Sequence, residues 1–224
     1  MGYKNKKIDP EKPLPKCYET EYSEISAKLM LEKFFPDRFV GLVAGVDKPD
    51  LCGEGMGVEV TSISPRYFRE MVNLYSEDYS YGDSQQRQKA YKQIRKLGGK
   101  IEEQILVHPA TNRNLNDLYV VLENKLKKLN KNYKIFDKNF LFIFSYVHIF
   151  SRDLAEILRL STEIVSKYET GFDSVFLYYL GGSLYEFDLK GNRYFCIDCE
   201  RYSVERLFVE ARKIIESKHR LWRQ

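Results

Sequence analysis

Asp50 and Glu59 are two acidic residues on either side of a glycine-rich segment, residues 53–56. This segment predicts a hairpin loop of four residues that joins two short strands. In that register Asp50 faces Glu59 across the hairpin, and Lys48 faces Thr61. Directly opposed residues have Cβ atoms about 4.5 to 5.5 Å apart, so two carboxylates repel unless a cation lies between them. The pair therefore predicts a site for Mg²⁺ or Mn²⁺, ions that prefer oxygen ligands.

A lysine beside these acids would complete a site for phosphodiester hydrolysis. The metal leaves room for a phosphate oxygen and an attacking water, and an ammonium group would orient that water. Lys48 shares a strand face with Asp50 and is our first candidate for this catalytic role. Competing candidates lie on the helix predicted at residues 84–97: Lys89, Lys92 and Lys96. The alternative interpretation of the hairpin is a pair of solvated acids, with Lys48 balancing their charge.

In the predicted hairpin, Cys52 pairs with Gly57. The elements around the hairpin predict a mixed α/β fold with a central sheet flanked by helices. The spacing of apolar residues predicts helices at residues 22–35, 84–97, 115–130, 152–168 and 204–221. Short apolar and β-branched runs predict strands at residues 39–46, 48–52, 57–62, 140–147, 174–180, 183–189 and 193–197. The last three strands form a meander. Residues 64–113 are less regular, contain a Tyr-rich loop and are interpreted as an insertion.

The helix at residues 115–130 has leucines at helical spacing. We expect this stripe to pack on the sheet face of Val58 and Val60, which leaves Lys125 and Lys128 near solvent.

The acidic hairpin and its flanking elements resemble the PD-(D/E)xK nuclease superfamily. Its core runs helix, three strands, helix, strand, and its signature lies on the second and third strands. Here Pro49-Asp50 matches the first half of the signature, and Glu59-Val60-Thr61 matches the second. The resemblance covers about residues 19–147. It implies a restriction-endonuclease-like core with a C-terminal β-meander and helix. We expect one domain of this fold at residues 19–224, which includes the insertion. A basic arm at residues 1–18 precedes it.

The resemblance also implies roles for individual residues. Members of that family that act as nucleases use the signature Asp and Glu as metal ligands, which carries over to Asp50 and Glu59. Many members add an acidic residue from the first helix, for which Glu24 is our candidate, although a solvated helix face explains this residue equally well. The family's signature lysine is replaced by Thr61. Either another lysine takes over, for which we infer Lys48, or catalysis is lost.

Two stretches carry positive charge without intervening acids, and such unneutralised cations suit contacts with phosphates. The candidate nucleic-acid-binding residues are Arg87, Lys89, Lys92, Arg95, Lys96, Lys125 and Lys128. The neighbouring tyrosines could stack on unpaired bases. The alternative is that both basic faces are simply solvated.

Composition narrows the class of protein. The chain has 224 residues, 43% of them hydrophobic, with a net charge of +4, which is typical of a globular protein. No apolar stretch follows Met1 and none is long enough to cross a membrane, so we expect a cytoplasmic protein without a membrane partner. Four cysteines do not form a disulfide framework, and the C-x-x-C pair Cys196 and Cys199 is at best half a zinc site.

Two functions follow as hypotheses. The first is a nuclease that uses Mg²⁺ or Mn²⁺ to hydrolyse phosphodiester bonds of nucleic acid. The second is a catalytically inactive module of the same fold that binds nucleic acid or a protein partner. The sequence does not discriminate DNA from RNA, and it is compatible with a homodimer.

Overall fold

The computed structural model describes residues 8–44, 49–107, 115–132, 134–179 and 182–220. The chain divides into two compact units. The larger unit comprises Ser23–Ile63 and Arg113–Ala211, and the smaller comprises Met1–Tyr22, Ser64–Asn112 and Arg212–Gln224. Among the described residues, no helix is both long and apolar enough to cross a membrane.

The larger unit is built on one mixed sheet of seven strands, in the order β1-β2-β3-β6-β7-β8-β9. The strands are β1 (Val43–Ala44), β2 (Leu51–Gly53), β3 (Met56–Ile63), β6 (Lys138–Ser145), β7 (Ser174–Tyr179), β8 (Ser183–Asp188) and β9 (Arg193–Asp198). The central strands β3, β6 and β7 are parallel, and all other neighbours are antiparallel. The predicted mixed α/β class is confirmed, and the expected meander is formed by β7, β8 and β9.

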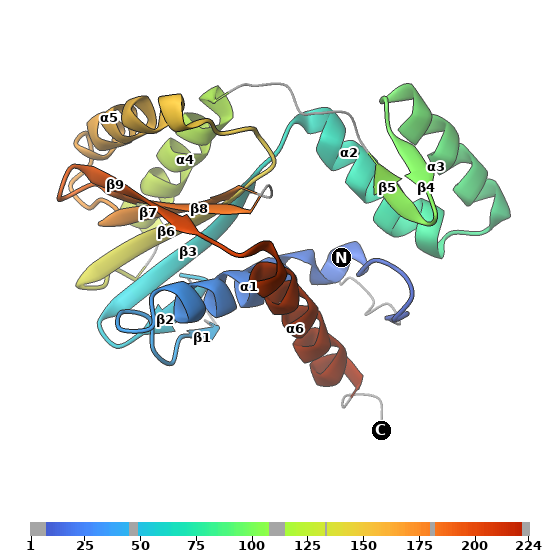
Figure 1. Cartoon of the computed structure of the whole chain (residues 1–224), viewed down its shortest axis with the longest axis horizontal. Coiled ribbons are helices and arrows are strands. Elements are labelled where there is room, and N and C mark those ends of the chain that lie inside the picture. The colour runs from blue at the N-terminus through green and yellow to red at the C-terminus, as the bar shows by residue number, and fades with distance from the viewer. Residues whose placement is uncertain (1–7, 45–48, 108–114, 133, 180–181, 221–224) are drawn as a thin grey trace. The chain divides into compact units, whose positions relative to one another are not determined.

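Helices cover both faces of this sheet (Figure 1). The helices are α1 (Glu19–Phe34), α4 (Asn116–Asn132), α5 (Leu154–Val165) and α6 (Arg201–Arg220). Apolar residues of α4 and α5 form one core cluster with one face of the sheet. Residues of α1 and the first half of α6 form the second cluster with the opposite face. The result is a layer of helices on each side of a sheet.

The central strand β6 shows why both layers are needed. Its sequence, Lys-Asn-Phe-Leu-Phe-Ile-Phe-Ser, is a nearly continuous apolar run, as expected for a strand that is buried on both faces. Leu141 and Ile143 belong to the cluster with α4, whereas Phe140, Phe142 and Phe144 belong to the cluster with α1. Alternation along one strand therefore divides the core in two.

The expected packing of α4 is wrong. Its leucine stripe packs with Leu141 and Ile143, whereas Val58 and Val60 lie in the opposite cluster with α1. The parallel register explains the difference, because Val58 pairs with Phe140 and Val60 pairs with Phe142. Paired residues of neighbouring strands point to the same face, so both valines face α1. The resemblance to PD-(D/E)xK nucleases was expected to show this packing. It therefore has no support from the position of α4 and stays a prediction.

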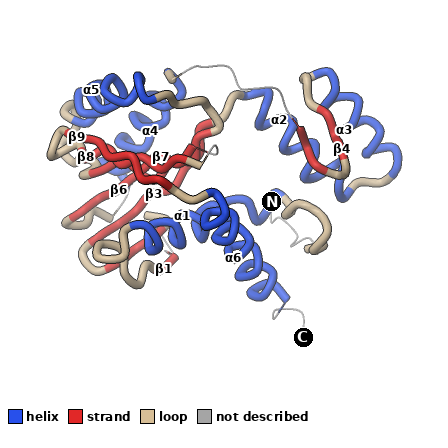
Figure 2. Tube along the Cα trace, in the orientation of Figure 1, coloured by secondary structure: helices blue, strands red, loops and turns tan. Residues whose placement is uncertain are grey.

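The smaller unit contains helices α2 (Arg66–Leu74) and α3 (Ser84–Lys96) and a ribbon of β4 (Lys100–Glu102) and β5 (Ile105–Val107) (Figure 2). The expected Tyr-rich loop is instead largely helical, since α2 continues into a π-helical turn at Tyr75–Tyr79. The predicted bounds of α3, residues 84–97, are confirmed to within one residue. Asp83 caps its first turn, and Gly98, at φ +87°, follows its end.

A partly buried ion pair joins the turn that follows α1 to β8, the second strand of the meander. The Arg38 guanidinium donates to both carboxylate oxygens of Glu186 at 2.7 and 2.9 Å, and Ser174 Oγ donates to the same carboxylate at 3.0 Å. Only 8% of the Glu186 side chain is exposed. The guanidinium also lies 4.8 Å from the ring centre of Phe35 and 5.1 Å from that of Phe176. The carboxylate is thus satisfied within an apolar layer.

We predict that Arg38→Met lowers the free energy of unfolding by about 3 kcal/mol, because it leaves the Glu186 charge buried and uncompensated. Urea unfolding followed by circular dichroism measures the change. Arg159→Met is the control, since the Arg159–Glu156 pair is 59% and 54% exposed and its loss costs less than about 1 kcal/mol. Equal losses in the two variants would contradict the anchoring role of Arg38.

Candidate functional site

The acidic hairpin has the predicted register. Cys52 pairs with Gly57, flanked by the pairs Leu51–Val58 and Gly53–Met56. Gly55 has φ +66°, in the left-handed region that the turn requires. A Cβ atom on Gly57 would lie 2.6 Å from the Pro49 ring. This close packing holds the residues just before β2 against β3.

Asp50 directly precedes β2 and reaches across the hairpin. Its carboxylate Oδ2 accepts a hydrogen bond from the backbone N–H of Val60 at 2.7 Å. The preceding residue Pro49 is buried, and Asp50 itself is half-buried. The carboxylate therefore lies beside the peptide that joins Glu59 to Val60.

Glu59 points from the middle of β3 toward α4. It pairs with Leu141, and that pairing places it on the face that α4 covers. The residue is 3% exposed, and its carboxylate Oε1 forms an ion pair with the Lys125 ammonium. The same ammonium donates to the Val60 carbonyl oxygen at 3.3 Å, and only 15% of the Lys125 side chain is exposed.

Val60 is thus the backbone link between the three charged groups. Its N–H donates to Asp50, and its carbonyl accepts from Lys125, which in turn binds Glu59. Two carboxylates and one ammonium are gathered around two consecutive residues of β3. That the two carboxylates share a cation stays a prediction.

Lys125 was expected near solvent, and that expectation is wrong. Four leucines of α4 are at most 3% exposed and form its buried stripe: Leu118, Leu122, Leu126 and Leu129. Lys125 lies three residues after Leu122 and four before Leu129, so it is on the same side of the helix. A lysine within a leucine stripe is the sequence signal that would have identified this contact.

The other residues proposed for catalysis and metal binding have different positions. Lys48 lies outside the described residues. Thr61 is half-buried on β3, on the same strand face as Glu59. Glu24 is half-buried on α1, which covers the opposite face of the sheet from the one toward which Glu59 points. Its role as a third ligand stays a prediction.

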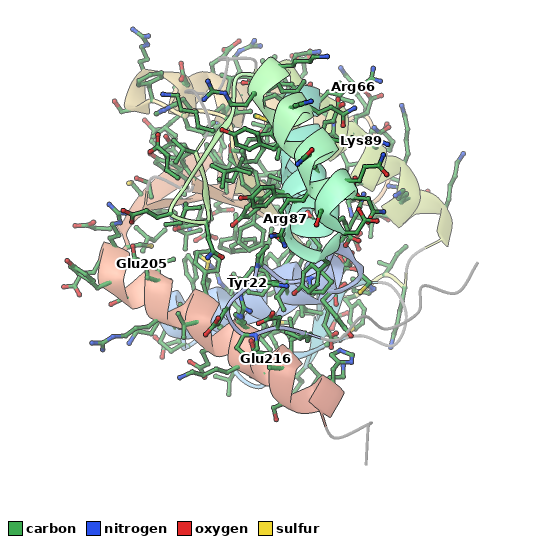
Figure 3. All side chains as sticks on the ribbon, turned by 90° about the vertical axis from the view of Figure 1, so that its right-hand side faces the viewer. Tyr22, Arg66, Arg87, Lys89, Glu205 and Glu216 are labelled. Carbon is green, nitrogen blue, oxygen red and sulfur yellow. The ribbon has the colours of Figure 1, made fainter. Side chains whose placement is uncertain are left out.

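The residues proposed to bind nucleic acid are exposed, with the exception of Lys125. Lys128 is on the outer side of α4, and the remaining residues are on α3: Arg87, Lys89, Lys92, Arg95 and Lys96. Arg87, labelled with Lys89 in Figure 3, donates to the Tyr79 carbonyl at 3.0 Å and lies 5.7 Å from the Tyr79 ring centre. The basic stretch of α3 is therefore a solvent-facing surface with one cation held against an aromatic ring.

The donor types of the hairpin fit a hard divalent cation. Two carboxylates are sufficient protein ligands for Mg²⁺, which fills its other positions with water and substrate oxygens. Within the described ranges, no group of three or more His, Cys, Asp or Glu side chains is placed to hold a metal ion. Asp50 and Glu59 would be the ligands, with Lys125 neutralising part of their charge in the arrangement described above.

The C-x-x-C pair does not have the properties of a metal or redox site. Cys196 is exposed on β9, whereas Cys199 is 4% exposed, and both thiols are free. Burial raises the pKa of Cys199 to about 11, and a higher pKa disfavours the thiolate that zinc binding and disulfide exchange require.

Comparison of the chain with protein-family models, curated proteins and solved structures finds no match.

We predict that Lys125→Met lowers the free energy of unfolding by about 3 kcal/mol, because the Glu59 carboxylate stays buried without its cation. Adding Glu59→Gln should recover part of this loss, which a double-mutant cycle measures as a coupling energy. Lys128→Met is the control on the exposed side of the same helix and should change stability by less than about 0.5 kcal/mol. Additive effects of the two substitutions would show that the ion pair is not formed.

Proposed function

We propose that this protein is a metal-dependent phosphodiesterase that acts on nucleic acid. Asp50 and Glu59 would hold Mg²⁺ or Mn²⁺, and Lys125 would provide the ammonium that PD-(D/E)xK nucleases carry on the third strand of their core. The observation that carries the proposal is the contact of Lys125 with both Glu59 and the Val60 carbonyl. It brings a lysine from α4 to the strand on which Thr61 occupies the signature position.

The order of elements supports the same proposal. The chain runs α1, then β1, β2 and β3, then α4 and β6, with residues 64–112 between β3 and α4. This is the helix, three strands, helix, strand order of the superfamily core. Asp50 stands at the start of the second strand and Glu59 within the third, as in the signature.

The chemistry of the site follows from its charges. When bound, the divalent ion supplies a Lewis acid that activates water and neutralises charge on the phosphate. The Val60 N–H fixes the Asp50 carboxylate, and the Val60 carbonyl and Glu59 fix the Lys125 ammonium. A fixed, partly desolvated ammonium stabilises developing negative charge more effectively than a mobile one in water. Lys125 would thus orient the attacking water or the scissile phosphate.

A specific observation favours the second candidate function, a catalytically inactive binding module. Glu59 is 3% exposed and already forms an ion pair with Lys125. A metal ion at Glu59 must therefore compete with the ammonium for the same carboxylate. In the inactive module this ion pair would be a structural contact between β3 and α4, and only the basic surfaces would bind nucleic acid.

Calorimetric titration with Mn²⁺ and a cleavage assay on single- and double-stranded DNA and RNA discriminate between the two functions. For the phosphodiesterase we expect Mn²⁺ binding that Asp50→Asn abolishes, and cleavage that Asp50→Asn and Lys125→Met each reduce by at least about 100-fold. Glu54→Gln removes an exposed acid from the turn of the same hairpin and should change neither. Absence of Mn²⁺ binding and of cleavage in the folded wild type would identify the inactive module.

Salt dependence tests the basic surface of α3. If Lys89 and Lys92 contact phosphates, Lys89→Gln and Lys92→Gln should each reduce the slope of log K against log [salt] for duplex DNA by about 0.9. Fluorescence anisotropy at several salt concentrations measures the slope. Lys127→Gln is the control, because the Lys127 ammonium is paired with Glu123 at 2.9 Å. An unchanged slope in the α3 variants would place the phosphate contacts elsewhere.

A further inference from the structure

The smaller unit contains a pocket of about 190 Å³ beside the π-helical turn Tyr75–Tyr79. Its walls come from four segments: residues 11–13, the π-helical turn with Ser80, Arg87 of α3, and Gln104 in the turn between β4 and β5. Drug-sized ligands occupy pockets of about 300 to 1,000 Å³, so this pocket suits a smaller chemical group. Single π-helical turns are rare and are frequent at functional sites, which makes this pocket a candidate binding site.

Hydrogen bonds hold the N-terminal segment, residues 9–13, in place at this pocket. The Arg212 guanidinium donates to three backbone carbonyls of this segment, at 2.7, 3.0 and 3.1 Å. The Tyr81 hydroxyl donates to the Pro13 carbonyl at 2.8 Å. The segment is therefore fixed on both sides of its pocket-lining residues.

Tyr75 joins the opposite walls of the pocket. Its hydroxyl donates to the Gln104 carbonyl, and its own carbonyl accepts from Ser80 Oγ at 2.7 Å. The Tyr75 ring stacks on the Tyr79 ring, with the ring centres 5.8 Å apart. These contacts form the pocket before a ligand binds, and a pre-formed site lowers the ordering cost of binding.

Arg87 brings a fixed positive charge to the pocket (Figure 3). Its Nε donates to the Tyr79 carbonyl at 3.0 Å, and its guanidinium lies 5.7 Å from the Tyr79 ring centre. In the part of the chain that the structure describes, Arg87 forms no ion pair, whereas five other arginines each pair with a carboxylate: Arg38, Arg159, Arg193, Arg201 and Arg212. The guanidinium is thus held through Nε while its two terminal nitrogens remain for bidentate binding of an anion.

Lys12 brings a second positive charge from the N-terminal segment. Its ammonium lies 3.4 Å from the Asp9 carboxylate, and the two side chains are 36% and 39% exposed. A pair at this exposure contributes little, so the ammonium can turn to a stronger anion. Glu11 is the acid among the lining residues, and its exposure to solvent and salt weakens its repulsion. The charges of the pocket therefore favour an anion.

We propose that this pocket binds the phosphate monoester at the end of a nucleic-acid strand. A phosphate monoester has a charge of about −1.5 to −2 and three acceptor oxygens, which suit two cations and a bidentate guanidinium. A diester within a strand carries a single charge and would have to enter and leave the pocket. Walls from four segments and a volume of about 190 Å³ instead suit a group at a chain end.

The surface of α3 favours a strand over another carrier of phosphate. After Arg87, the helix continues with four exposed cations: Lys89, Lys92, Arg95 and Lys96. A row of cations suits the successive phosphates of a strand, whereas one phosphorylated side chain would use only the first. The choice of ligand rests on the nucleic-acid binding proposed above. It does not rest on the metal site, because the pocket lies in the smaller unit, whereas Asp50 and Glu59 belong to the larger.

Fluorescence anisotropy of the full chain in EDTA tests the pocket without hydrolysis, so that its failure and the failure of the proposed metal site are distinguishable. The probes are one oligonucleotide with a phosphate at its 5′ end, at its 3′ end or at neither end. We expect one phosphorylated form to bind at least about 10-fold more tightly than the form without a terminal phosphate. Arg87→Gln should remove this preference. Arg66→Gln, the control at an exposed position of α2, should retain it. Circular dichroism establishes that both variants are folded.

Glu11→Gln tests the pocket in the opposite direction and does not depend on the folding of Arg87→Gln. Removal of this acid should increase the preference for a terminal phosphate, because it removes a repulsive charge from the pocket. Competition with adenosine monophosphate distinguishes the two sources of a terminal phosphate. Failure of the mononucleotide to displace the phosphorylated probe supports a strand end as the ligand.

Three results would overturn the proposal: equal binding of the three probes by the wild type, a preference that Arg87→Gln retains, or a preference that Glu11→Gln weakens. Displacement of the probe by the mononucleotide at equal concentration would overturn the strand end and identify a free nucleotide as the ligand of the pocket.

Discussion

Parallel pairing of β3 with β6 fixes the direction of every side chain on the third strand. The pairing runs from Met56 opposite Lys138 to Ile63 opposite Ser145 without interruption. Val58 and Val60 consequently face α1, and Glu59 faces α4. A carboxylate that points into an apolar layer must be neutralised or compensated, because its desolvation costs several kcal/mol. Lys125 meets that requirement, so the position of one lysine on α4 follows from a strand register.

The ion pair between Glu59 and Lys125 is not explained by stability alone. Replacing a buried pair by apolar residues of similar size is often neutral or stabilising, since the attraction only offsets the loss of hydration. The leucines on either side of Lys125 show that this face of α4 accommodates apolar side chains. Packing therefore does not explain why a charged pair occupies this place. Handling of a phosphate or a metal ion is the reason that our proposal gives, and conformational specificity is the reason in an inactive module.

Local features of the sequence predicted local features of the fold. The hairpin register followed from the positions of its glycines, and Gly57 shows why, because Pro49 leaves no room for a side chain there. The end of α3 was predicted from the glycines after its last turn, and the structure adds that Asp83 caps its start. Both predictions depend on residues close together in the chain. For the same reason the mixed α/β class could be read from the succession of apolar patterns.

Features that depend on distant residues were missed. Whether α1 or α4 covers Val58 and Val60 is decided by which strand pairs with β3, and periodicity within either helix does not contain that information. Lys125 was expected to face solvent, as the neighbouring lysines do. Its position between buried leucines of α4 is the feature that distinguishes it from them. The Tyr-rich segment was predicted as a loop because its apolar residues do not follow the spacing of an α-helix. A π-helical turn, which the structure shows at Tyr75–Tyr79, does not follow that spacing either.

The position of residues 64–112 between β3 and α4 has a consequence for how the chain folds during synthesis. β2 and β3 are adjacent in the chain and can pair as soon as both are made, whereas β6 emerges only after the whole intervening segment and α4. Until then, the side of β3 that later binds β6 is an open edge, and the Glu59 carboxylate has neither its covering helix nor its lysine. Contacts between residues far apart in sequence form slowly, because closure of the long loop must precede them. The Glu59 carboxylate of the newly made hairpin therefore stays hydrated until α4 and β6 have been synthesised.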